Sequence, residues 1–154
     1  MSPVLTVPLQ LRFGDEDSYG HVNNARFVQF LEDARVRLLS EPGSGFTFLE
    51  VTDAGHYTLV GRHEIEYLAP LNFSREPAGV DVWITAVGAS SFTLGYAVRD
   101  TTEPGAGTTC ALASTTMILV DRQSGRPVRL NETQRSALGQ WIGDGVPFRR
   151  TSGA

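Results

Sequence analysis

The chain has 154 residues, of which 41% are hydrophobic and 19% charged, a composition that is ordinary for one globular domain. Its formal net charge of −4 argues against a nucleic-acid partner. No stretch approaches the roughly 20 apolar residues of a transmembrane helix, so no membrane insertion is expected. The single cysteine, Cys110, cannot form an intramolecular disulfide, and the N-terminus lacks the pattern of a signal peptide. We therefore expect a cytoplasmic protein.

The first forty residues predict a strand, a polar loop and a long helix. Leu5 to Phe13 alternates apolar and polar residues, as a half-buried strand does, and Pro8 favours a place at a sheet edge. After the loop, Asn23 or Asn24 can cap a helix, because an amide oxygen accepts the free N–H groups of the first turn. Apolar residues then recur at helical spacing, which predicts a helix over about 24–39.

The remainder of the chain predicts strands with no helix between them, followed by one short helix. Such strands pair mainly antiparallel, and a single helix packed on one face of the sheet gives an α+β domain. One helix leaves part of the sheet and an edge uncovered, so we expect a dimer. We expect residues 1–142 to form the domain and 143–154 a flexible tail. The predicted strands are His56–Leu68, Val80–Val87, Ser91–Arg99 and Thr109–Val120, and the short helix is Glu132–Leu138.

The segment Phe13–Asn24 carries the most chemical information. It places three acids, a histidine, two glycines and two amides between the strand and the helix, and such residues are poor core material. A junction of this kind suits a site where a carboxylate faces a ligand and backbone N–H groups are open at a helix start. Asp17 is therefore the leading catalytic candidate. The alternative is that Asp17 caps a turn or complements the helix dipole.

The segment also carries a family resemblance. The run from Asp15 to Asn24, followed by an aromatic-rich helix that ends in Glu32-Asp33-Ala34-Arg35, closely resembles hotdog-fold acyl-CoA thioesterases of the hydroxybenzoyl-CoA thioesterase type. The likeness continues through Glu64–Pro70, Gly88–Ser91 and Val120-Asp121. It implies a five-stranded antiparallel sheet wrapped around the long helix, with active sites at the interface of a homodimer or homotetramer. It also implies hydrolysis of an acyl-CoA thioester to free acid and CoA.

The resemblance implies roles for residues of the loop. Asp17 would be the nucleophile or general base, and the backbone N–H of Asn24 would polarise the thioester carbonyl. Gly20 would permit a backbone conformation that a side chain forbids, or close approach of the substrate. His21 would form a polar wall or position water, although a structural hydrogen bond is the simpler interpretation.

We further expect five residues to contact the substrate. Ser90 and Ser91 lie at a hairpin where related folds thread pantetheine, and surface solvation is the alternative for them and for Arg62. No cofactor is expected, because coenzyme A is part of the substrate, and the three histidines lack metal-ligand spacing. The expected substrate contacts are Tyr19, Asn23, Arg62, Ser90 and Ser91.

Other interpretations stay open at this point. The chain could act on acyl-carrier-protein thioesters, bind acyl thioesters without catalysis, or be a dehydratase that pairs His21 with Asp17. Glu32 and Asp33 are expected on the helix flank or in dimer salt bridges, and His63 is expected to be a satisfied core histidine. Aromatic residues that could line an acyl pocket or belong to the core are Phe46, Phe48, Tyr57, Phe73, Phe92 and Tyr96.

Overall fold

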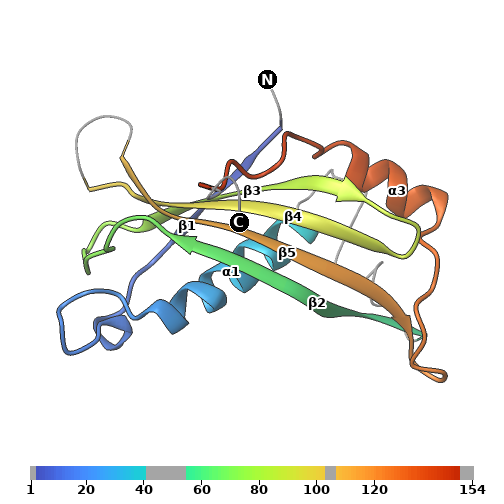
Figure 1. Ribbon diagram of the computed structural model, residues 1–154, viewed down its shortest axis with the longest axis horizontal. Helices are drawn as coiled ribbons and strands as arrows, with labels where there is room; N and C mark the ends of the chain where they lie inside the picture. Colours follow the sequence, from blue (N-terminus) through green and yellow to red (C-terminus); the bar gives the residue numbers. More distant parts are fainter. Residues whose placement is uncertain (1–2, 41–54, 103–106, 150–154) are drawn as a thin grey trace.

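A five-stranded antiparallel sheet curves around one long helix in the computed structural model, which describes residues 3–40, 55–102 and 107–149 (Figure 1). The strand order is β1-β3-β4-β5-β2, and each neighbouring pair is antiparallel. This arrangement confirms the predicted α+β hotdog fold. The strands are β1 (Leu5–Leu9), β2 (His56–Tyr67), β3 (Ala78–Val87), β4 (Ser91–Asp100) and β5 (Thr108–Asp121); the helices are α1 (Asn24–Leu39) and α3 (Glu132–Gly139).

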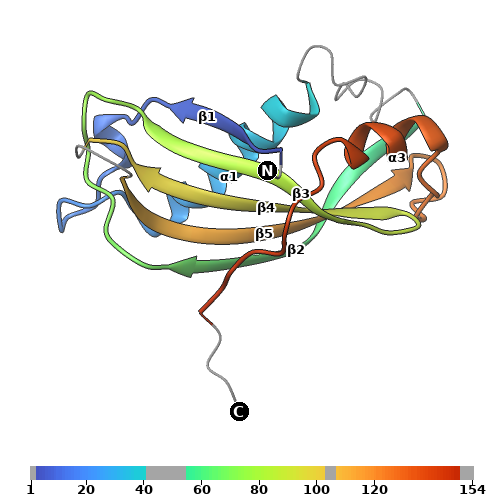
Figure 2. The ribbon, with the colours of Figure 1, turned by 90° about the horizontal axis from the view of Figure 1, so that it is seen from above.

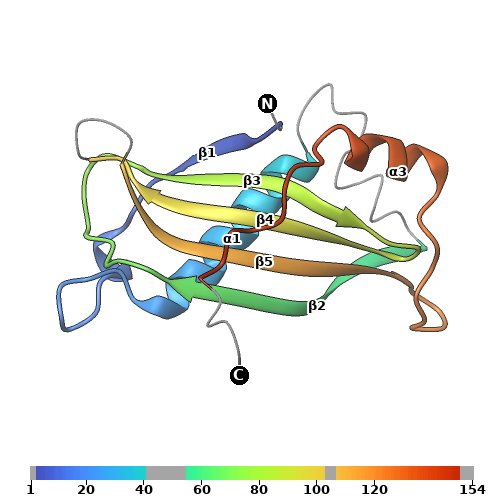
Figure 3. The ribbon, with the colours of Figure 1, turned by 45° about the horizontal axis from the view of Figure 1, so that its top comes forward.

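Helix α1 has the bounds that its sequence predicted. The Asn23 side chain caps it by accepting the Ala25 N–H at 3.0 Å, so Asn23 rather than Asn24 is the N-cap. Its buried residues recur every three or four positions, and they form a continuous core with the facing side of the sheet. Figure 3 shows α1 crossing behind the sheet on a diagonal. The first turn of α1 therefore lies at one end of the sheet.

The first strand is shorter than predicted. β1 pairs with β3 only as far as Leu9, which faces Ala78, and the chain then leaves the sheet and forms a 3-10 turn at Phe13–Asp15. Pro77 precedes Ala78 and has no backbone N–H to extend the ladder. Leu11 is nevertheless buried, because the chain folds back over the core. The alternation of apolar and polar residues thus continues along the sequence beyond the last residue of the strand. Pro8 does lie in an edge strand, as expected.

The C-terminal segment crosses the face of the sheet opposite α1 (Figures 2 and 3). The Trp83 Nε1–H donates to the carbonyl of Asp144 at 2.7 Å, and the N–H of Arg149 donates to Glu66 at 2.9 Å. Gly95 leaves room for the crossing, since a Cβ there would lie 2.8 Å from both Trp83 and Val146. Residues 143–149, expected to be a flexible tail, are thus tied to β3 and β2, whereas 150–154 lie outside the described residues.

Two further sequence expectations concern α3 and Cys110. Asn131 and Gln134 form a reciprocal capping box at the start of α3, which confirms the short C-terminal helix. Cys110 is fully buried, and burial raises the pKa of its thiol, as suits a structural residue rather than a nucleophile. Over the described part of the chain, no helix combines the length and apolar character needed to span a bilayer.

Candidate active site

The loop between β1 and α1 folds as a tight turn around Asp17. The N–H of Asp17 donates to the carbonyl of His21 at 2.8 Å, and the N–H of Gly20 donates to the carbonyl of Asp17 at 3.1 Å. Gly20 has a φ of 81°, a left-handed conformation that disfavours any side chain, as the sequence predicted for this glycine. The turn fixes where the Asp17 carboxylate points.

The two carboxylate oxygens of Asp17 have different environments. Oδ1 accepts the N–H of Tyr19 at 2.8 Å and, more weakly, that of His21 at 3.4 Å. Oδ2 receives no hydrogen bond from any residue that the structure describes. Asp17 therefore does cap its own turn, as the alternative interpretation held, but it does so with one oxygen. The other oxygen is available to a substrate.

The start of α1 presents an open donor. The N–H of Asn23 donates to the carbonyl of Asp15 at 2.8 Å, and the N–H of Ala25 is taken by the Asn23 side chain. Among the described residues, nothing accepts the N–H of Asn24. This donor lies at the positive end of the helix dipole, where an oxyanion is stabilised. It is therefore suited to polarise a carbonyl.

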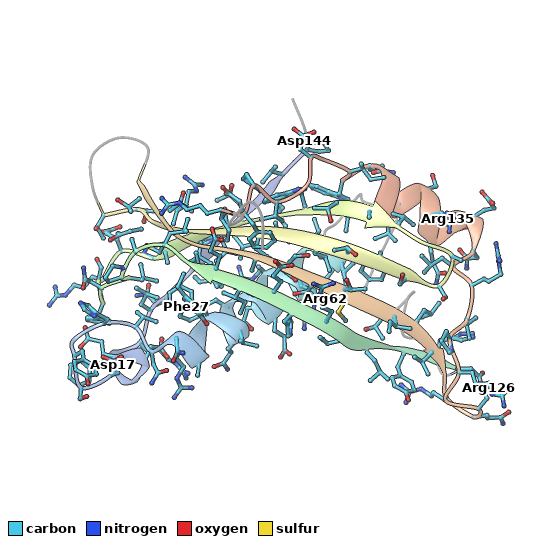
Figure 4. All side chains as sticks on the ribbon, in the orientation of Figure 1. Asp17, Phe27, Arg62, Arg126, Arg135 and Asp144 are labelled. Carbon is cyan, nitrogen blue, oxygen red and sulfur yellow. The ribbon has the colours of Figure 1, made fainter. Side chains whose placement is uncertain are left out.

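A cavity of about 400 Å³ brings the carboxylate and the helix start together. Figure 4 shows Asp17 on the loop and Phe27 on the first turns of α1 at the same end of the molecule. One side of the cavity is polar, and the opposite wall is apolar and comes from the chain that follows β2. The lining residues are Asp17, His21, Val22, Asn24, Phe27, Tyr67, Leu68, Ala69, Pro70 and Leu71.

Tyr67 and the segment after it were not predicted as site residues. The hydroxyl of Tyr67 donates to the backbone carbonyl of Asn24 at 3.0 Å, and its ring meets that of Phe27 edge-on at 5.3 Å between centroids. Partial burial raises the pKa of the Tyr67 phenol, which keeps it protonated as a donor. The N–H of Val22 donates to the carbonyl of Leu71 and ties the loop to this wall. The sequence signals were the place of Tyr67 at a strand end and within the run Glu64–Pro70 that resembles the family.

Asp15 is the structural acid of the loop. It is 3% exposed, and its carboxylate accepts the N–H of Arg12 at 2.8 Å. The guanidinium groups of Arg12 and Arg26 lie 3.7 and 3.8 Å from the same carboxylate. These contacts make Asp15 an acceptor that holds the turn together.

Three of the expected substrate contacts lie away from this cavity. Ser91 faces Ile118 in β5, whereas Tyr67 faces Ala111, so about 23 Å of strand separates the hairpin from the cavity. Figure 1 shows the turn between β3 and β4 at the opposite end of the sheet from the loop. Arg62 is exposed on the middle of β2 and pairs with Glu64 at 3.7 Å. Within one chain, the structure does not bring Arg62, Ser90 or Ser91 to Asp17.

The other two expected contacts are nearer. Tyr19 belongs to the Asp17 turn, but its side chain is 83% exposed and does not line the cavity. Asn23 uses its side-chain oxygen to cap α1. His21 lines the cavity and is exposed, and its backbone closes the turn.

A second group of polar residues lies between the middle of α1 and the sheet; we call Arg35, His63, Tyr96 and Thr115 the Arg35 cluster. The Arg35 side chain is 6% exposed and contacts exposed Glu32 at 3.5 Å. The Arg35 Nη1 and the Tyr96 hydroxyl are buried without a well-aligned hydrogen bond to a described residue, although the Tyr96 hydroxyl lies close to Arg35 and Thr115. His63 Nδ1 lies 2.8 Å from the Thr115 hydroxyl. His63 is hydrogen-bonded, but it is exposed on edge strand β2, so its expected place in the core was wrong.

The remaining expectations divide between core and surface. Glu32 and Asp33 are exposed on the flank of α1, as predicted. Phe92 and Tyr96 are core residues, whereas Phe46 and Phe48 lie outside the described residues. In the part of the chain that the structure describes, no group of three or more His, Cys, Asp or Glu side chains is placed to hold a metal ion.

Comparison with known proteins agrees with this fold. The family model described as the thioesterase-like superfamily matches residues 11–138. The chain belongs to this superfamily. Membership confirms the hotdog thioesterase resemblance and the predicted class of thioester hydrolase.

Solved structures of superfamily relatives superpose over most of the chain. A thioesterase from Thermus thermophilus, complexed with coenzyme A and Zn, is 28% identical, with 89% of this chain and 92% of that one covered and a TM-score of 0.67. The PA5185 protein of Pseudomonas aeruginosa is 26% identical, with 92% and 97% covered and a TM-score of 0.74. Slr0204 from Synechocystis, a 1,4-dihydroxy-2-naphthoyl-CoA thioesterase, is 18% identical, with 89% and 96% covered and a TM-score of 0.76, a likeness of fold alone.

Proposed function

We propose that this superfamily member hydrolyses acyl-CoA thioesters to a free acid and CoA. The observation that carries the proposal is that one cavity is lined by a carboxylate with an open oxygen and by a helix start with an open N–H. The coenzyme A bound to the Thermus thermophilus relative supports CoA as the carrier of the acyl group.

In the proposed reaction the thioester carbonyl oxygen accepts the N–H of Asn24. Oδ2 of Asp17 either attacks the carbonyl carbon or takes a proton from an attacking water, and the thiolate of CoA leaves. Attack by Asp17 gives a mixed anhydride that one water then hydrolyses; general-base action gives the acid directly. One donor aimed at the developing oxyanion contributes about 3 kcal/mol of transition-state stabilisation.

The neighbours of Asp17 have supporting roles in this proposal. Gly20 gives the turn its conformation, and His21 forms the polar wall or positions water. The apolar wall after β2 receives the acyl chain, because its side chains offer no hydrogen bonds to compete for the carbonyl. Tyr19 and Asn23 contact the substrate from the rim of the cavity. No cofactor is invoked, since coenzyme A arrives as part of the substrate, and a cytoplasmic location stays an expectation.

We also propose that the active form is a homodimer or homotetramer. Edge strand β2 exposes Leu59 and Val60, and α1 exposes Val28 and Val36, so apolar surface accompanies an unpaired strand edge. Arg62, Ser90 and Ser91 lie far from the cavity of their own chain, so they contact the substrate only if a second copy supplies them. Light scattering on the purified protein should give a multiple of the 16.7 kDa chain mass. A monomeric mass at micromolar concentration would remove this part of the proposal.

The central test is release of free thiol from short, medium, long and aromatic acyl-CoAs. We expect Asp17→Asn to lower kcat at least about 100-fold, because the amide keeps the shape and the turn acceptor but cannot act as base or nucleophile. Asp33→Asn is the matched control, since Asp33 is an exposed acid outside the cavity. Wild-type turnover by the Asp17 variant would refute its assignment.

The same assay separates the rival functions. A thioesterase for acyl carrier proteins would release thiol from carrier-linked substrates and not from the CoA thioesters. A non-catalytic protein would bind acyl-CoA, as titration calorimetry detects, and would release no thiol. The net charge of −4 opposes docking of a carrier protein that is itself acidic.

A further inference from the structure

Tyr67 joins the end of the sheet to the start of α1. Its hydroxyl donates to the backbone carbonyl of Asn24 at 3.0 Å, across 43 residues of sequence. The ring is held edge-on against Phe27, which is 3% exposed, at 5.3 Å and 85°. The aromatic contact restricts the ring and so directs the hydroxyl at one carbonyl.

The backbone that carries Tyr67 is itself fixed. The N–H groups of Leu68 and Ala69 both donate to the carbonyl of Cys110 in β5, at 2.8 and 3.2 Å. On the opposite face of the sheet, the preceding Glu66 accepts the N–H of Arg149 at 2.9 Å. The backbone at Tyr67 is therefore held in place, and the Tyr67 side chain extends from the sheet to the helix.

The carbonyl that Tyr67 binds belongs to the same planar peptide as the N–H of Ala25. That N–H donates to the side chain of Asn23 at 3.0 Å. One peptide plane is thus held from both ends, by Tyr67 on its oxygen and by Asn23 on its nitrogen. The adjoining plane, which carries the open N–H of Asn24, has its other end fixed because the carbonyl of Asn23 accepts the N–H of Arg26 at 2.9 Å. Both bonds limit rotation of the proposed oxyanion donor.

We propose that Tyr67 is a positioning residue for the oxyanion donor, an inference that rests on the proposed thioesterase function. The first turn of a helix has the fewest backbone hydrogen bonds and frays most readily. A bond from the phenol to the first carbonyl of α1 opposes this fraying and keeps the Asn24 N–H directed into the cavity. The phenol acts through the Asn24–Ala25 peptide, and its contribution appears when the carbonyl oxygen gains negative charge.

The test is Tyr67→Phe, which removes the hydroxyl and keeps the ring against Phe27. Thr6→Val is the control, because it also removes one hydroxyl hydrogen bond, which Thr6 on edge strand β1 donates to Asp81 at 2.7 Å, and Thr6 does not line the cavity. Loss of one neutral hydrogen bond predicts a fall in kcat of about 3- to 10-fold for Tyr67→Phe, with KM within about twofold of wild type. Amide hydrogen exchange over the first turn of α1 should become faster in this variant. Both quantities should be unchanged in Thr6→Val.

Each outcome decides the proposal. Wild-type kcat in Tyr67→Phe, or an equal fall in Thr6→Val, would overturn it, and so would unchanged exchange at the helix start. A rise in KM with constant kcat would make Tyr67 a wall of the acyl site and not a positioning residue. If the wild-type protein releases thiol from no acyl-CoA, the proposed function fails separately. The exchange comparison then decides alone whether Tyr67 orders the helix start.

Discussion

The Asp17 loop and the Arg35 cluster both place charged groups against α1, but they treat buried polar atoms in opposite ways. In the loop, buried Asp15 accepts a backbone N–H and lies near two guanidinium groups, and the open atoms belong to exposed or half-buried residues. In the cluster, the buried Arg35 Nη1 and Tyr96 hydroxyl lack a well-aligned hydrogen bond to a described residue. An open polar atom that a ligand can reach serves chemistry, whereas one sealed in the core affects stability. We therefore expect substitutions in the two regions to change the free energy of unfolding by different amounts.

The largest effect should come from Asp15→Ala. This change leaves the Arg12 N–H without its acceptor and two guanidinium groups without a nearby carboxylate, so the free energy of unfolding should fall by about 2–3 kcal/mol. Urea denaturation followed by circular dichroism measures the loss. Glu16→Ala, one residue along the same loop, should cost less than about 0.5 kcal/mol. Equal losses in the two variants would mean that Asp15 has no special structural role.

A smaller effect is expected for Arg35→Met. Arg35 is buried with one long contact to exposed Glu32, so an apolar side chain of similar length should leave the free energy of unfolding within about 1 kcal/mol of wild type, or raise it. Arg37→Met, at an exposed position in the last turn of α1, is the control and should cost a few tenths of a kcal/mol. Paired urea titrations compare the two. A loss above about 3 kcal/mol for Arg35→Met would show that the guanidinium is well satisfied, which would erase the contrast with the loop.

The smallest effect should be a pH dependence due to His63. Partial desolvation of the exposed ring and the charge of Arg35 lower the His63 pKa below its usual value of 6.5, against an opposing effect of Glu32. The unfolded chain therefore binds a proton more tightly than the folded one, and stability is lost as pH falls below about 6.5. His63→Gln should flatten the dependence of melting temperature on pH between about 7.5 and 5.5. An unchanged slope would assign the pH dependence to other groups.

Features that depend on neighbouring residues in the sequence were predicted well, and features that depend on distant contacts were not. The bounds of α1 and the capping box of α3 follow from spacing and side-chain type within a few residues, and the structure confirms them. The predicted end of β1 was wrong, because the length of an edge strand depends on where its partner strand stops. The Asp17 turn was predictable from its acids and glycines, and Gly20 has the left-handed φ that such a turn requires.

The residues that the sequence did not reveal are joined by distant contacts. The bond between Tyr67 and Asn24 exists because β2 is an edge strand whose end passes the helix start, which no local pattern shows. The position of Ser90 and Ser91 relative to Asp17 likewise depends on strand order. Residues 143–149 were expected to belong to a flexible tail, yet they have hydrogen-bond partners on β3 and β2.

The strand order also has a consequence for how the site forms during synthesis. β2 precedes β3 in the chain but pairs only with β5, so it has no neighbouring strand until residues up to Asp121 have been made. Until then, the Asp17 loop and α1 lack the fixed wall that carries Tyr67. Pairing over so long a sequence separation is slow to form. The cavity beside Asp17 is therefore among the last parts of the nascent protein to be completed, and a truncated chain that ends before β5 would contain Asp17 without the completed cavity.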